Sequence, residues 1–130
     1  MVVDTSALVA ILFAESTAER LMEAILAAPR PIVSAASLVE VGIVAIARRG
    51  EASERELNSL LGQFRLQIIP VTADHAERAL GAFRRFGKGR HPAGLNYGDC
   101  FSYALASITG EPLLCVGDDF ARTDLQIASY

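Results

Sequence analysis

Short apolar runs alternate with helix-forming segments along this chain, and the alternation is the feature that most constrains its fold. The runs expected to form strands are residues 1–3, 32–33, 66–71 and 113–116, with residues 125–128 as a candidate edge strand. Between them lie segments that open with helix N-cap residues and carry apolar stripes. Strands that alternate with helices pair in parallel through right-handed crossovers. The sequence therefore predicts an α/β fold, a three-layer α/β/α sandwich around a central, mostly parallel sheet.

Length and composition favour one domain over residues 1–130, with 52% hydrophobic and 21% charged residues. This balance is far from the composition of disordered chains. A net charge of −3 argues against polyanion binding through bulk charge, although a local basic patch can still form. The two cysteines, Cys100 and Cys115, have no CxxC or Cys/His spacing, so we expect small core residues rather than a zinc site or a disulfide.

A membrane or secreted location is not indicated. The N-terminus has no basic stretch followed by an apolar signal segment. Residues 32–47 are the longest apolar run, but this run is shorter than the roughly 20 residues that span a bilayer. We therefore expect a cytoplasmic protein without membrane contact.

A single carboxylate, Glu40, interrupts the apolar run of residues 32–47. The pattern from residue 35 onward predicts a helix that is covered on nearly every side. A buried carboxylate must be protonated, paired with a cation or bound to a metal. The alternative is that Glu40 lies on a narrow exposed stripe of that helix.

Acidic residues follow the predicted strands and open the predicted helices, where open α/β sheets gather ligands. These residues are Asp4, Glu40, Asp99, Asp118 and Asp119. Each has a simpler structural explanation, as a helix N-cap, a dipole partner or a turn residue. Together they would repel one another unless a cation neutralises them, and an all-oxygen set favours Mg²⁺ or Mn²⁺ over zinc.

Such a site usually acts on phosphate esters, because a bound divalent cation can activate water without a nucleophilic side chain. The chain has no GxSxG elbow and no Walker loop. Four basic residues lie close together before the Asp99 helix, and they can form a phosphate-binding patch: Arg84, Arg85, Lys88 and Arg90. The alternative is a solvated helix end. We expect His75 and His91 to be surface residues.

Four blocks of the sequence, in this order, resemble the PIN-domain ribonucleases and specifically the VapC toxins of toxin–antitoxin modules. The blocks are MVVDTSAL, SLVEVGIV, NYGDCFSYALA and LLCVGDDFARTDL, and the resemblance spans essentially the whole chain. By position, Asp4, Glu40 and Asp99 match the three principal acidic residues of the family, and Ser6 matches the small hydroxyl residue that supports the first. The fourth acidic residue aligns best with Asp118, with Asp119 and Asp124 as alternatives.

The resemblance implies a Mg²⁺- or Mn²⁺-dependent endoribonuclease that cuts structured RNA such as tRNA or rRNA and inhibits translation. It also implies a VapB-type antitoxin as partner, in a heterotetramer or larger assembly. A homodimer is expected from the apolar residues around Ile11, Leu12 and Phe13 and around Leu21 and Leu26, which exceed the needs of a small core.

Two other classes of protein remain as alternatives. One is a PIN-like binding module with weak or no catalytic activity, which the near-complete acidic set disfavours. The other is a Mg²⁺-binding phosphoacceptor signalling domain. That class needs an Asp after the central strand and a Lys near the last strand, whereas residues 70–72 read Pro-Val-Thr and the only lysine is Lys88.

Overall fold

The computed structural model describes residues 1–130 and contains short strands and longer helices in alternation. In chain order the elements are β1 (Val2–Val3), α1 (Thr5–Leu12), α2 (Ala18–Ala27), β2 (Ile32–Ser34), α3 (Ala35–Arg49), α4 (Ala52–Gln63), β3 (Gln67–Ile69), α5 (Ala73–Phe86), α6 (Tyr97–Thr109), β4 (Leu113–Leu114) and a 3-10 turn at Phe120–Arg122. The predicted strands at the first four apolar runs are therefore present. β1, β3 and β4 are shorter than their runs, whereas β2 extends one residue beyond its run, to Ser34.

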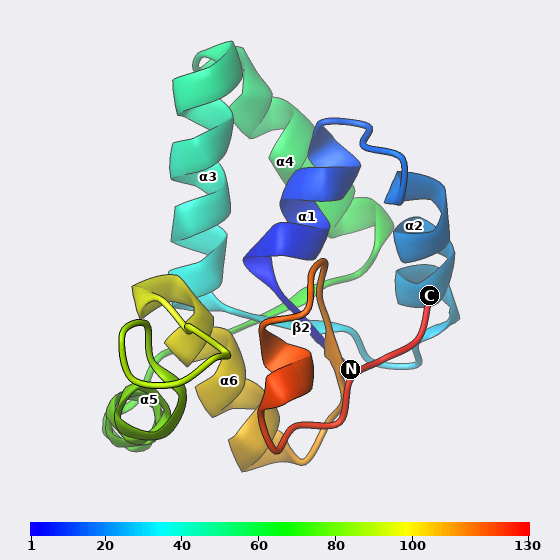
Figure 1. The fold of residues 1–130 in the computed structure, drawn as a ribbon. Coiled ribbons are helices and arrows are strands. Elements are labelled where there is room, and N and C mark those ends of the chain that lie inside the picture. The colour runs from blue at the N-terminus through cyan, green and yellow to red at the C-terminus, as the bar shows by residue number, and fades with distance from the viewer.

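The four strands form one parallel sheet in the order β3-β2-β1-β4 (Figure 1). This arrangement confirms the predicted α/β fold. The candidate edge strand at residues 125–128 does not form, because this segment joins β4 only through an isolated parallel bridge between Leu113 and Ile127. β1, which Asp4 follows, and β4, which Asp118 and Asp119 follow, are therefore neighbours. β1 lies inside the sheet and β4 lies at its edge.

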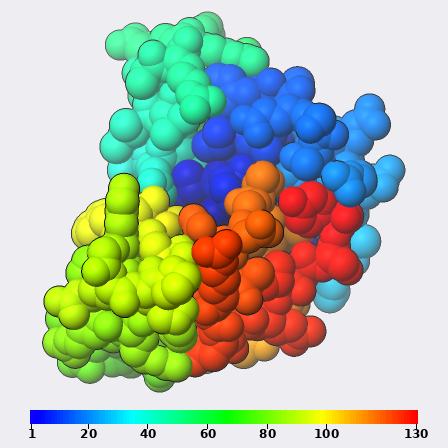
Figure 2. Space-filling view, viewed as in Figure 1, coloured from blue at the N-terminus to red at the C-terminus, as the bar shows by residue number.

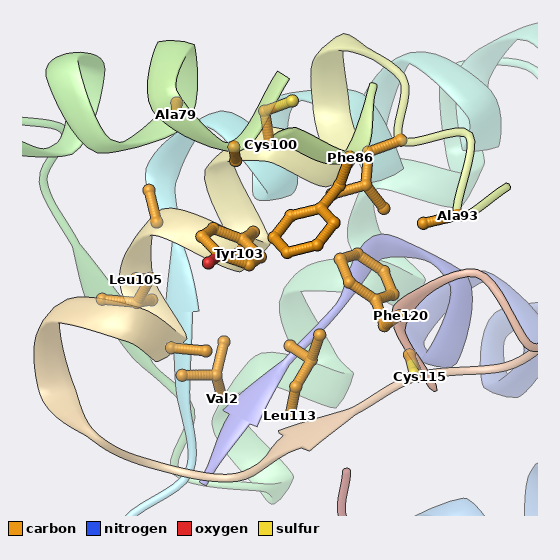
Figure 3. Packing of buried hydrophobic residues seen from close by; sticks show 14 of the residues in the cluster. Val2, Ala79, Phe86, Ala93, Cys100, Tyr103, Leu105, Leu113, Cys115 and Phe120 are labelled. Carbon is orange, nitrogen blue, oxygen red and sulfur yellow. The ribbon is translucent and has the colours of Figure 1, made fainter. Parts of the chain in front are cut away.

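Alternate strand residues face two separate cores, one on each side of the sheet. Val2, Ile32 and Leu113 pack with residues of α5 and α6, whereas Val3, Val33 and Leu114 pack with residues of α1 to α4. Figure 3 shows the first core, where the rings of Phe86 and Tyr103 lie 5.6 Å apart. The two cores give the three layers that the alternating pattern predicts.

Cys100 and Cys115 are both free and buried, as expected from their spacing. Both belong to the core beneath α5 and α6 (Figure 3). Burial, together with the charges of Asp4, Asp99 and Asp119, raises the pKa of the Cys115 thiol to about 12, and burial raises that of Cys100 to about 11. These thiols therefore stay protonated at neutral pH and serve as packing residues.

Helix α3 is not covered on nearly every side, so that prediction was wrong. Its inward face carries Val41 and Ala45, while Val39 and Ile43 on the other face are 61% and 63% exposed. The helix packs against α1, α4 and α6, and no element of the chain covers its outer face. Both faces are apolar, so the residue pattern alone could not distinguish them.

Helix α5 buries only part of its apolar sequence. Ala79, Ala82 and Phe86 face the core, whereas Leu80 and Phe83 are exposed. On α1 and α2 the reverse holds, because Ile11, Leu12 and Leu21 are buried in the core. The apolar surplus that suggested a homodimer interface there is therefore mostly core, apart from the exposed Leu26.

None of the helices combines the length and the hydropathy that crossing a membrane requires.

Candidate active site

Asp4 lies at the carboxyl end of β1 and is only 2% exposed. It is the N-cap of α1, and its Oδ2 accepts hydrogen bonds from the Ser6 backbone N–H at 2.9 Å and the Ser6 hydroxyl at 2.6 Å. The Ser6 hydroxyl oxygen in turn accepts from the backbone N–H of Val116 at 2.9 Å, just beyond β4. Ser6 thereby fixes Asp4 and ties the start of α1 to the segment that carries Asp118 and Asp119.

The second carboxylate oxygen of Asp4, Oδ1, is buried and makes no hydrogen bond. A buried acceptor without a partner is costly, and functional sites are where native proteins retain one. Oδ1 is therefore available to a cation or to a bound water. This feature fits the metal site that the acidic pattern predicts.

Glu40 reaches the same region from the second turn of α3 and is half-buried. Its Oε2 accepts a 2.8 Å hydrogen bond from the hydroxyl of Thr5, the residue next to Asp4. The carboxylate also lies directly against Gly98, in the first turn of α6. Glu40 is thus neither fully buried nor free on the surface, so neither sequence interpretation was complete.

Asp99 closes a capping box at the start of α6. Its Oδ2 accepts from the backbone N–H of Asn96 at 2.8 Å, and its own N–H donates to Asn96 Oδ1 at 3.0 Å. The pKa of Asp99 is raised to about 6, chiefly by burial and also by the charges of Asp4, Glu40 and Asp119, while the Asn96 hydrogen bond opposes the rise. Carboxylates from three other segments therefore act on Asp99.

The segments that carry these acids are far apart in the sequence but meet on one face of the molecule. In Figure 2 the blue, cyan, yellow and orange parts of the surface come together near the centre of the view. Figure 1 shows why, since the start of α1, the start of α3 and the segment after β4 all lie at the same edge of the sheet, where α6 also begins. These segments meet at the carboxyl ends of the strands, which is where parallel α/β sheets bind their ligands.

The two neighbouring aspartates after β4 differ in their relation to this cluster. Asp119 raises the pKa of both Asp99 and Cys115, whereas Asp118 contributes to neither. Asp124 is engaged elsewhere, because its carboxylate accepts a 2.6 Å hydrogen bond from the Tyr103 hydroxyl and pairs with Arg85 at 2.9 Å. The charge of Asp119, rather than that of Asp118, therefore acts on Asp99, and Asp124 is paired elsewhere.

The four carboxylates do not form a ready-made cage, since no three acidic, histidine or cysteine side chains are placed to share one ion. Asp4, Glu40 and Asp99 each accept a hydrogen bond from a donor of their own, namely Ser6, Thr5 and Asn96. To share one cation, these carboxylates must therefore come closer together than they are here. The donors are all oxygens, which suits Mg²⁺ or Mn²⁺.

The basic residues lie at the end of α5 and in the loop that follows, and all four are exposed. Arg85 is paired with Asp124, and Arg90 lies over the Phe83 ring with its guanidinium carbon 5.8 Å from the ring centre. Arg84 and Lys88 make no ion pair. Half of the predicted patch is therefore engaged with the protein itself.

The two histidines are structural rather than surface residues. His75 is buried and closes a capping box with Thr72, so its predicted exposure was wrong. His91 is partly buried, and its ring accepts a hydrogen bond from the Ala93 N–H. The ring packs against that of Phe86 in a T-shaped arrangement, with 5.2 Å between the ring centres. Sequence reasoning also missed Thr5 and Gly98, the two residues that hold Glu40.

Comparisons with known proteins identify the family of the chain. The model of the PIN domain family matches residues 1–125. The chain is 52% identical to a ribonuclease VapC of Mycolicibacterium smegmatis over 96% of this chain and 97% of the relative. It is 51% identical to ribonuclease VapC30 of Mycobacterium tuberculosis over 96% of this chain and 95% of the relative.

Two solved structures share the fold at lower sequence identity. The crystal structure of the Mycobacterium tuberculosis toxin VapC20, a sarcin-ricin loop cleaving toxin, matches with a TM-score of 0.80 at 18% identity and covers 99% of this chain and 98% of that one. A toxin–antitoxin complex from Klebsiella pneumoniae matches with a TM-score of 0.73 at 22% identity, over 99% of this chain and 97% of that one.

Proposed function

This chain belongs to the PIN-domain family, among its VapC ribonucleases, and we propose that it is a toxin that cuts RNA with the help of Mg²⁺ or Mn²⁺. The observation that carries the proposal is the convergence of four acidic segments at the carboxyl ends of the strands, where burial and the charges of Asp4, Glu40 and Asp119 raise the pKa of Asp99. Such a cluster is unfavourable in a protein unless it binds a cation.

We assign Asp4, Asp99 and Asp119 as the cation ligands, with Glu40 as a ligand or as the base that orients the attacking water. When bound, a divalent cation lowers the pKa of water and stabilises the leaving oxyanion of a phosphodiester. The chain's own residues set the geometry: Ser6 holds Asp4, and Asn96 holds Asp99. Asp118 lies outside this assignment.

Structured RNA, such as tRNA or rRNA, is the proposed substrate, and cutting it would inhibit translation in the cytoplasm. Support comes from the similar fold of VapC20, which cleaves the sarcin-ricin loop. Arg84 and Lys88, which make no ion pair in the protein, are the residues that we expect to contact backbone phosphates.

A VapB-type antitoxin is the proposed partner, in a heterotetramer or larger assembly. The similar fold of the Klebsiella pneumoniae toxin–antitoxin complex supports this proposal. A basic side chain of the antitoxin placed among the four carboxylates would compete with the cation.

A homodimer is also part of the proposal, but with a different surface from the one suggested by the sequence. Val39 and Ile43 on α3, Leu80 on α5 and Tyr97 on α6 are exposed, and Tyr97 is 80% exposed. Between α5 and α6 lies a groove of about 370 Å³ whose seven lining residues are all hydrophobic. A twofold axis would let the apolar ridge of α3 in one copy cover the groove of the other.

Light scattering tests this interface. We expect a dimer at micromolar concentration, a monomer for Ile43→Glu, and a dimer for Leu26→Glu, which adds the same charge to an exposed site on α2. A wild-type protein that is monomeric at this concentration would refute the homodimer.

RNA cleavage tests the proposed function itself. End-labelled tRNA and rRNA are incubated with antitoxin-free protein and Mg²⁺ or Mn²⁺, with and without EDTA. We expect discrete fragments that disappear with EDTA. Cleavage that survives EDTA would overturn the metal-dependent mechanism, and no cleavage by folded protein would favour a binding module instead.

A further inference from the structure

Glu40 is held in place by two residues that come from other helices, Thr5 on α1 and Gly98 on α6. We propose that these residues form a seat that holds the Glu40 carboxylate between the first turns of α1 and α6, next to the residues that precede Thr5 and follow Gly98, Asp4 and Asp99. Both are positioning residues, because they act through Glu40. The effect of the seat on RNA cleavage rests on the proposed function. Its effect on cation binding can be measured without that function.

Thr5 supplies the polar half of the seat. Its hydroxyl donates to Glu40 Oε2 at 2.8 Å, while its other acceptor in reach, the Ser37 carbonyl, is 3.5 Å away. Thr5 follows Asp4 directly, so the backbone that places the first acid also places the donor to the second. A threonine side chain has few χ1 rotamers, which makes it a stiff support.

The donor is neutral, and this matters for the charge of the cluster. An arginine or lysine partner would place a positive charge beside Glu40, whereas the Thr5 hydroxyl is a neutral donor. Glu40 Oε1 makes no hydrogen bond within the protein. One oxygen is therefore fixed by Thr5 and the other is available to a cation or a water.

Gly98 supplies the steric half of the seat. A Cβ built at this position would lie 2.6 Å from both Cδ and Oε1 of Glu40, closer than non-bonded atoms approach. A glycine inside a helix costs about 0.5–1 kcal/mol relative to alanine. The close approach of the Glu40 carboxylate gives a physical reason for a glycine in the first turn of α6.

The backbones of α3 and α6 cannot easily separate to relieve such a clash. The hydroxyls of Ser37 on α3 and Ser102 on α6 lie 3.0 Å apart, and both residues are fully buried. A side chain at position 98 would therefore displace the Glu40 carboxylate rather than the helix. The displaced carboxylate would lose its hydrogen bond to Thr5.

Four variants test the seat, with Mn²⁺ affinity measured by calorimetry beside kcat and KM for RNA cleavage. Thr5→Val removes the hydroxyl at nearly constant volume, Thr5→Ser keeps it, and Gly98→Ala adds the Cβ. Thr109→Val is the control, because the Thr109 hydroxyl bonds only to backbone of its own helix. Gly62→Ala is a second control, since an added Cβ at position 62 meets nothing within 4 Å.

We expect Thr5→Val and Gly98→Ala to weaken Mn²⁺ binding by about 10-fold and to lower kcat while KM is unchanged, as for other residues that orient metal ligands. Thr5→Ser and both controls should behave as wild type. The thermal midpoint of Gly98→Ala should not fall, because alanine favours the helix.

Wild-type Mn²⁺ affinity in both Thr5→Val and Gly98→Ala would overturn the seat, as would a Thr5→Ser variant as impaired as Thr5→Val. If Gly98→Ala fails to fold, the Thr5 pair decides alone. A wild-type protein that binds Mn²⁺ but cuts no RNA would overturn the proposed function, and the Mn²⁺ comparison would still decide the seat. A wild type that binds no Mn²⁺ overturns both.

Discussion

The starts of α5 and α6 carry the same local structure and differ in their surroundings. At α5, Thr72 and His75 close a capping box, with the Thr72 hydroxyl 2.7 Å from His75 Nδ1. At α6, Asn96 and Asp99 close another, with a 2.8 Å hydrogen bond from the Asn96 N–H to Asp99. At the α6 box, burial and the charges of Asp4, Glu40 and Asp119 together raise the pKa of Asp99.

A capping box by itself therefore says nothing about function. Both boxes satisfy backbone N–H groups that a helix start leaves without partners. The α6 box also holds an acid whose pKa rises to about 6 because it is buried beside three other acids. The α5 box should matter for stability alone, and the α6 box for cation binding and catalysis.

Asp99→Asn should produce the largest effect. An asparagine side chain can still accept the Asn96 N–H, so the fold should persist, but the charge that binds the cation is lost. We expect cleavage to fall by at least about 100-fold, the loss typical of a group that takes part in the chemistry. The matched control is Asp74→Asn, an exposed acid in the first turn of α5, which should cleave as wild type. Full activity in Asp99→Asn would remove the distinction between the two boxes.

Asp119→Asn and Asp118→Asn form the next test, because the two residues are adjacent, exposed and chemically identical. Of these two residues, only Asp119 raises the pKa of Asp99. We expect Asp119→Asn to lower the Asp99 pKa, measured by carbon-detected NMR, and to reduce cleavage by about 10-fold, in the range for groups that support a metal site. Asp118→Asn should change neither. The reverse result would assign the fourth position to Asp118.

The pH dependence of stability sharpens the comparison further. The folded protein holds a proton on Asp99 up to about pH 6, whereas the ordinary pKa is 3.8. The folded state therefore binds more protons between these values, and this stability contribution is lost as the pH rises through about 6. In EDTA, Asp99→Asn should gain stability over wild type as the pH rises from 4 to 7. A constant difference in unfolding midpoint across this range would contradict the raised pKa.

The smallest effect is expected at the α5 box. Thr72→Ala removes the side-chain acceptor of the N-cap and should cost about 1 kcal/mol in the free energy of unfolding. Cleavage per folded molecule should not change. Urea unfolding and the cleavage assay together check this prediction, and a loss of cleavage larger than the loss of folded protein would connect His75 or Thr72 to the site.

The fold was largely predictable from the sequence because its signals are local. N-cap residues such as Thr72 and Asn96, and the αL glycine Gly110, mark the helix ends that the structure contains. The exposed face of α3 was not predictable, since Val39 and Ile43 are as apolar as the inward Val41. Burial there depends on which helices of the chain lie nearby, and that information is tertiary.

The candidate site was likewise predictable from the sequence only in part. The carboxylates at the strand ends could be proposed from the order of strands and helices, because the carboxyl ends of parallel strands lie on the same side of a sheet. The role of Gly98 could not, since a glycine in a helix gives no indication of which carboxylate approaches it. Nor could the sequence tell whether Asp118 or Asp119 belongs to the site. Adjacent side chains point in different directions, and their directions depend on the backbone conformation after β4.

The most direct test of the account is a calorimetric titration of the metal-free protein with Mn²⁺ at pH 7, beside Asp99→Asn. We predict saturable binding by the wild type that is lost in Asp99→Asn, retained in Asp74→Asn and weakened below about pH 6, where Asp99 becomes protonated. Equal binding by wild type and Asp99→Asn, or no binding by the folded wild type, would contradict the claim that these carboxylates form a cation site.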